Sequence, residues 1–114
     1  MAYQKKASLL GDKRTFELAA QIKKYTLRDV GFTESHGGKF VLERSLDPNS
    51  PFNAALKFKM TISAELKTFK MAVTAANGLK EVNLFKENDA AARIEQLDYL
   101  LAVLVKRQIL TQVV

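Results

Sequence analysis

Two runs of alternating apolar and polar residues in the middle of the chain decide the fold. They read Leu56-Lys57-Phe58-Lys59-Met60-Thr61-Ile62 and Phe69-Lys70-Met71-Ala72-Val73-Thr74-Ala75. A period of two places neighbouring side chains on opposite faces of a strand, so each run predicts a strand with one buried and one solvated face. The pair Asn77-Gly78 is typical of a tight hairpin turn. Residues 79–85 are therefore predicted to return as a third antiparallel strand.

Weaker patterns of the same kind flank this meander. Alternation predicts further strands at residues 3–9, 15–18 and 39–46, with a strand edge at 32–35. The first two are predicted to form a hairpin around Gly11-Asp12-Lys13. Residues 19–30 have apolar side chains at helical intervals and are predicted to form a short helix that ends at Gly31, because glycine fits a left-handed cap.

A long helix is predicted after residue 87. Asn88 or Asp89 can accept hydrogen bonds from its first turn, and three alanines follow. Its apolar residues recur at spacings of three and four, namely Ile94, Leu97, Leu101, Leu104 and Val105. The helix is expected to fray near Thr111. These elements predict an α+β fold in which an antiparallel sheet carries a short helix and a long C-terminal helix on one face.

Length and composition restrict the class of protein. The 114 residues fit a single domain, 1–114, and 47% of them are hydrophobic, which argues against disorder. The absence of cysteine and the single histidine exclude disulfides, thiolate sites and the usual zinc sites, so no metal is expected. No apolar run approaches the roughly 20 residues of a membrane span, and no secretory signal is visible. We therefore expect a cytoplasmic protein.

Positive charge is concentrated in the body of the chain. The formal net charge is +6, and residues 81–114 contribute none of the excess. Three lysines, Lys57, Lys59 and Lys70, are predicted to lie on the solvated face of the sheet, where they can contact the phosphates of RNA. The alternative is that they keep this face soluble, because Phe58 and Phe69 fall on the apolar side and leave no aromatic for base stacking.

No catalytic arrangement is visible in the sequence. His36 is the only imidazole and lies in the turn-forming stretch Ser35-His36-Gly37-Gly38. Gly37-Gly38-Lys39 lacks the earlier glycine and the following hydroxyl residue of a phosphate loop. No catalytic residue and no cofactor is predicted, and an enzyme is disfavoured.

The densest polar segment surrounds the two prolines, Pro48 and Pro51. Arg44, Asp47 and Asn49 stand together there and, with Arg28, are candidate contacts for a ligand or partner. The alternative is structural, since an arginine there can pair with a nearby acid while Asp47 and Asn49 build the turn.

The long helix is apolar on all sides between Tyr99 and Val105. One sheet cannot cover every side of a helix, so either other segments enclose it or part of it packs on another chain. Leu100 and Val103 are the predicted contacts of a homodimer.

Segments far apart in the chain resemble one bacterial family. Residues 24–32, 43–48 and 50–52 are similar to the family called domain of unknown function 1831, found in lactic acid bacteria and related Gram-positives. The resemblance covers nearly the whole chain. It implies a cytoplasmic single-domain protein with a curved antiparallel sheet and a long helix, similar to the TATA-binding-protein-like group. It also suggests a link to sulfur transfer or tRNA thiolation, although a chain without cysteine cannot carry a persulfide.

Three functions are compatible with these observations. The first is a non-enzymatic binding or adaptor domain with a protein partner or a second copy of itself, linked to RNA or sulfur metabolism. The second is an RNA-binding module that uses the basic sheet face. The third is a small-ligand domain with a pocket between helix and sheet, lined by the proline loop.

Overall fold

The computed structural model describes residues 3–47, 56–75, 80–88 and 90–113. In chain order its elements are β1 (Lys6–Ala7), β2 (Phe16–Leu18), α1 (Lys24–Val30), β3 (Thr33–Glu34), β4 (Phe40–Ser45), β5 (Leu56–Ile62), β6 (Phe69–Ala75), the 3₁₀ helix η1 (Leu84–Lys86), α2 (Ala91–Lys106) and β7 (Leu110–Gln112). The mixed α+β class predicted from the sequence is confirmed. The more specific TATA-binding-protein-like arrangement stays a prediction.

The larger sheet contains four antiparallel strands in the order β3-β4-β5-β6. Strands β5 and β6 have the predicted bounds, and Met60 lies opposite Met71 at their centre. The apolar side chains of both strands are buried, whereas Lys57, Lys59 and Lys70 on the other face are partly exposed. The alternating pattern therefore distinguishes an inner face, which meets the core, from an outer face.

A second sheet joins three short strands in the order β1-β2-β7. The predicted hairpin of the first two strands is confirmed, with Ala7 opposite Phe16. Gln4 and Phe69 form an isolated bridge in which each backbone N–H donates to the other's carbonyl, both at 2.9 Å. This bridge links the N-terminal segment to β6, so both sheets line one hydrophobic core.

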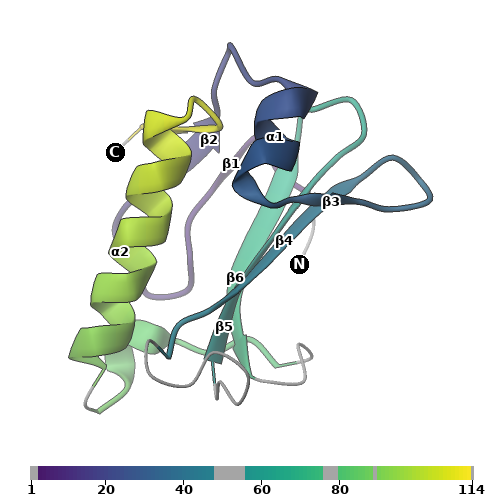
Figure 1. The fold of residues 1–114 in the computed structure, drawn as a ribbon. Helices are drawn as coiled ribbons and strands as arrows, with labels where there is room; N and C mark the ends of the chain where they lie inside the picture. Colours follow the sequence, from purple (N-terminus) through teal and green to yellow (C-terminus); the bar gives the residue numbers. More distant parts are fainter. Residues whose placement is uncertain (1–2, 48–55, 76–79, 89, 114) are drawn as a thin grey trace.

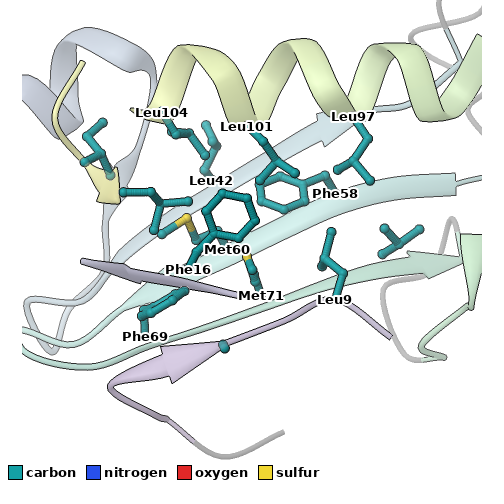
Figure 2. Packing of buried hydrophobic residues seen from close by; sticks show 14 of the residues in the cluster. Leu9, Phe16, Leu42, Phe58, Met60, Phe69, Met71, Leu97, Leu101 and Leu104 are labelled. Atoms are coloured by element: carbon teal, nitrogen blue, oxygen red, sulfur yellow. The ribbon is translucent and has the colours of Figure 1, made fainter. Parts of the chain in front are cut away.

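The helix α2 closes this core from one side. Figure 1 shows α2 alongside the long strands, with α1 near one end of them. In Figure 2, Leu97, Leu101 and Leu104 point from α2 toward the strands, where Phe58 and Leu42 meet them. All five side chains are at most 2% exposed. Burying side chains of this size is the main source of the domain's stability.

Both helices end in the same hydrogen-bonded cap. After α1, Gly31 has a φ of 115° and the Phe32 N–H donates to the Leu27 carbonyl at 2.9 Å. After α2, Gln108 has a φ of 61° and the Ile109 N–H donates to the Leu104 carbonyl at 2.9 Å. This motif reverses the chain and buries the residue that follows the cap. At the end of α2, this cap directs the chain into β7.

Three sequence-based boundaries were wrong. The strand predicted at residues 79–85 is cut short. The chain does return antiparallel to β6, since Glu81 bridges Thr74 and the Val82 N–H donates to the Val73 carbonyl at 2.8 Å, but η1 then begins because the Asn83 side chain accepts a hydrogen bond from the Phe85 N–H. The short helix begins at Lys24 instead of residue 19, since the preceding residues form a turn. Thr111 does not belong to a fraying helix but lies in β7 opposite Glu17.

The start of α2 also differs from the expectation. Its N-cap is Ala90, which makes no side-chain capping hydrogen bond, and the helix proper begins at Ala91. Asp89, Asn77 and Gly78, together with the proline loop from residue 48 to 55, lie outside the described residues.

Candidate functional site

A pocket of about 330 Å³ lies between the C-terminal half of α2 and strands β2 and β7. Its lining combines an apolar wall with a rim of positively charged, negatively charged and polar side chains. The lining residues are Arg14, Phe16, Asp98, Leu101, Ala102, Val105, Lys106 and Gln112. They come from three segments that are far apart in the sequence, and the order β1-β2-β7 brings them together.

Arg14 is fixed in the pocket by two carboxylates. Its Nε lies 3.0 Å from Oδ1 of Asp12 and its Nη2 lies 3.0 Å from Oδ2 of the same residue. Its Nη1 lies 2.9 Å from Oδ1 of Asp98 on α2. The hydrogen bond with Asp12 raises the pKa of the Arg14 guanidinium above its ordinary value, although partial burial acts in the opposite direction. Arg14 therefore connects the β1–β2 hairpin to α2 and is always charged.

The guanidinium keeps donors for a ligand. An arginine offers five N–H groups. The contacts with Asp12 and Asp98 use one N–H of each nitrogen, so Nη1 and Nη2 each retain a second one within the part of the chain that the structure describes. Lys106 adds an exposed ammonium group to the rim. These groups can bind an anion such as a carboxylate.

The arginines predicted as ligand contacts both make internal interactions. Arg28 forms an exposed ion pair with Glu34 at 2.8 Å. Arg44 donates from Nη2 to the Val30 carbonyl at 2.9 Å, which satisfies a free carbonyl at the end of α1. Both side chains thus lie near the C-terminal end of α1, and neither lines the pocket.

Asp47 also has an internal partner. Its Oδ1 lies 2.6 Å from Nε of Arg93, a residue of α2, and both side chains are largely buried. The pair ties the end of the β4 segment to the first turns of α2. Asn49 lies outside the described residues; of the other three predicted contacts, Asp47 pairs with α2, whereas Arg28 and Arg44 lie at the end of α1.

The predicted lysine face exists on the outer side of the larger sheet. Lys57 and Lys59 lie on β5, and Lys70 lies opposite Thr61 on β6. None of the three forms an ion pair with any residue in the described ranges. However, the exposed Glu43 lies directly opposite Lys59 on β4 and reduces the positive potential there.

An aromatic ring lies on this basic face. The ammonium groups of Lys39 and Lys70 lie 5.4 Å and 4.9 Å from the ring centre of Tyr3. Because Lys39 precedes β4 and Lys70 belongs to β6, the ring lies across the outer face. The sequence does not single out Tyr3, because the strand predicted at residues 3–9 leaves open which face its ring occupies.

The exposed part of α2 is displaced from the predicted dimer contacts. Leu100 and Val103 are partly buried, and Leu100 packs against the core. The exposed apolar residues in the C-terminal half of the helix are Tyr99, Ala102 and Val105.

The described residues contain no metal-binding group. No cluster of three or more His, Cys, Asp or Glu side chains occurs among them, and His36 is exposed in a turn. Neither described helix has the length and apolar composition needed to cross a bilayer.

Only the fold reveals the pocket residues. Arg14 and Asp98 are 84 positions apart in the printed sequence, and no motif connects them. The one local signal is Asp12-Lys13-Arg14, in which a turn aspartate and an arginine two residues later can form a side-chain pair.

The fold and the pocket together define a small α+β protein with a pocket between its long helix and its N-terminal hairpin. The chain belongs to the family DUF1831, whose model matches residues 1–111 and carries the description "Putative amino acid metabolism". It is similar to the crystal structure of a DUF1831 family protein from Lactobacillus plantarum. The two share 46% sequence identity with a TM-score of 0.90, over 99% of each chain. No curated protein matches the chain.

Proposed function

We propose that this protein binds a small molecule that carries a carboxylate and an apolar group, and that the ligand is an apolar amino acid. The observation that supports this proposal is the pocket around Arg14. Its volume of about 330 Å³ lies at the small end of the range for ligand pockets.

The lining suits the three parts of an amino acid. The unused N–H groups of Arg14 and the ammonium of Lys106 can bind the carboxylate. Asp98 is half exposed and can accept a hydrogen bond from the amino group. Ala102 and Val105, which lie over the buried Phe16 and Leu101, supply apolar surface for the side chain.

Two further points support the proposal. The description of the family refers to amino acid metabolism. In addition, Arg14 is held from two sides before any ligand arrives, so little side-chain entropy is lost when it binds an anion. The proline loop, which the sequence analysis placed at such a pocket, lies outside the described residues.

Titration of the ¹⁵N-labelled protein with leucine, followed by NMR, tests the proposal. We expect leucine to shift the amide signals of Leu101, Ala102 and Val105. Leucinamide lacks the carboxylate, and 4-methylpentanoate lacks the amino group, so both should bind more weakly. The protein is kept at micromolar concentration so that weak self-association does not contribute.

Variants locate the site. Lys106→Met keeps the aliphatic side chain without its charge and should weaken leucine binding about tenfold, because it removes one charged hydrogen bond. Lys86→Met removes an exposed lysine from η1 and serves as the matched control. No shift at millimolar leucine, or equal binding by both variants, would contradict the proposal.

RNA binding on the outer sheet face is a second candidate function. Tyr3 supports it, because an aromatic side chain between Lys39 and Lys70 can stack on an unpaired base. We expect the double variant K57E/K59E to lose binding to a labelled single-stranded RNA, and binding by the unmodified protein to fall steeply with salt. Salt-independent binding, or equal binding by K86E and K57E/K59E, would refute this candidate.

Two other properties remain proposals. We propose a cytoplasmic location, supported by the absence of cysteine and testable by fractionation of cells. An adaptor role would use the exposed face of α2.

A further inference from the structure

The helix α2 presents an exposed apolar face that the described residues do not cover. Tyr99 is 65% exposed and Val105 is 39% exposed, and Ala102 lies between them. Asp98 and Lys106 flank these three residues, and we call the five the 98–106 face. Tyrosine at such exposure, surrounded by further apolar residues and bordered by charge, is typical of an interaction surface.

The 98–106 face is complementary to itself. Tyr99 and Val105 lie three residues before and after Ala102, about 4.5 Å along the helix axis in each direction. Asp98 and Lys106 lie four residues before and after it, about 6 Å in each direction, and they carry opposite charges. A twofold axis at that point brings residues at equal and opposite displacements to the same level along the two antiparallel helices.

We propose that two copies of this chain pack their α2 helices antiparallel around a twofold axis at Ala102. The long side chain of the partner's Lys106 then reaches Asp98, and Tyr99 lies at the level of the partner's Val105 on the opposite edge of the contact. The same arrangement occurs again on the other side of the axis. The small side chain of Ala102 allows the helix axes to approach to within about 8–10 Å.

The charges favour a second copy over an unrelated partner. A helix with one charge sign along its exposed face would repel itself, whereas this face changes sign from Asp98 to Lys106 at its midpoint. Asp98 can contact Arg14 and the partner's Lys106 at the same time. Its Oδ1 lies 2.9 Å from Nη1 of Arg14, and its second oxygen has no partner within the described ranges. A twofold dimer is also the commonest closed assembly.

The dimer would complete the pocket described above. Asp98, Ala102, Val105 and Lys106 belong to both the 98–106 face and the pocket lining. A second copy packed on this face would therefore lie at the pocket mouth and shield a bound molecule from water. The inference does not depend on the proposed function, because self-association is measured without any ligand.

Sedimentation equilibrium of the full chain, over micromolar to millimolar concentrations, tests the inference. We expect a reversible dimer. Asp98→Lys and Lys106→Asp should each raise the dissociation constant about tenfold, because the axis applies each repulsion twice. The double variant D98K/K106D restores both pairs with their signs exchanged and should dimerise nearly as well as the unmodified protein. Lys86→Asp is the matched control and should not change the dissociation constant.

The double variant separates an effect on the interface between copies from an effect on the stability of the fold. Asp98→Lys also removes the contact with Arg14, and any loss of stability from that change would persist in the double variant. Recovery of the dimer can therefore come only from pairing between copies. A monomer at every concentration, or a double variant no better than Asp98→Lys, would overturn the inference. Leucine binding by a protein that stays monomeric would leave the pocket proposal intact.

Discussion

Replacing Gly31 by alanine is expected to destabilise the domain by about 2–3 kcal/mol, from two separable causes. The first is the backbone. Gly31 caps α1 with a φ of 115° and a ψ of 12°, a conformation that L residues with a side chain rarely adopt. The strain of a Cβ in this region costs about 1–2 kcal/mol.

The second cause is a close approach by Arg44. A Cβ on residue 31 would collide with Nη2 of Arg44, the atom that donates to the Val30 carbonyl at 2.9 Å. The flexible guanidinium can move away, but the hydrogen bond to the end of α1 is then lost. For a half-buried arginine this bond contributes about 1 kcal/mol.

A double-mutant cycle measured by urea unfolding separates the two causes. In the R44M background only the backbone strain remains, so G31A should cost about 1 kcal/mol less there than in the unmodified protein. Gly38→Ala is the matched control. Its φ is 84°, but an added Cβ would lie 3.4 Å from the Ala64 Cβ, an ordinary contact, so only the strain should appear. Equal costs of G31A in both backgrounds would refute the role assigned to Arg44.

Two further predictions concern the C-terminal part of the chain. Gln108→Gly should stabilise the domain by up to about 1 kcal/mol, since Gln108 holds a φ of 61° at the end of α2; thermal unfolding at an unchanged or lower temperature would contradict this. Leu110→Ala should cost about 2–4 kcal/mol in urea unfolding, because Leu110 is 1% exposed and belongs to the core; a cost like that of the exposed Thr111→Ala would show that β7 contributes little.

Local patterns predicted the centre of the fold because they determine it directly. The alternation in Leu56–Ile62 and Phe69–Ala75 gives the bounds of β5 and β6 without any tertiary information. The cap at Gly31 was also predictable, since the residue type and the required φ agree.

Elements that depend on distant partners were less predictable. Residues 110–112 form a strand only because β2 lies beside them, and Gln108 at the end of α2 gives no glycine signal for the reversal. The segment around Asn83 has strand-like residues, but the Asn83 side chain stabilises a 3₁₀ turn instead. Local propensity yields to tertiary contacts in both segments.

The residues of the candidate site show the same contrast between local patterns and tertiary contacts. The residue types of Arg28, Arg44 and Asp47 suggested a ligand, yet their nearest acids and carbonyls are internal. The pocket around Arg14 depends on the meeting of β2, β7 and α2, which no single segment encodes. The prediction that the outer lysines are solvated followed from the strand period alone.

The place of β7 beside β2 affects how the protein is made. Phe16 emerges from the ribosome long before Gln112, its opposite residue in the sheet. At about 5–20 residues per second, β2 waits on the order of ten seconds for this neighbour. During that interval an apolar strand edge is open to other nascent chains. Translation of β7 therefore ends the period in which the open edge of β2 can pair with another chain.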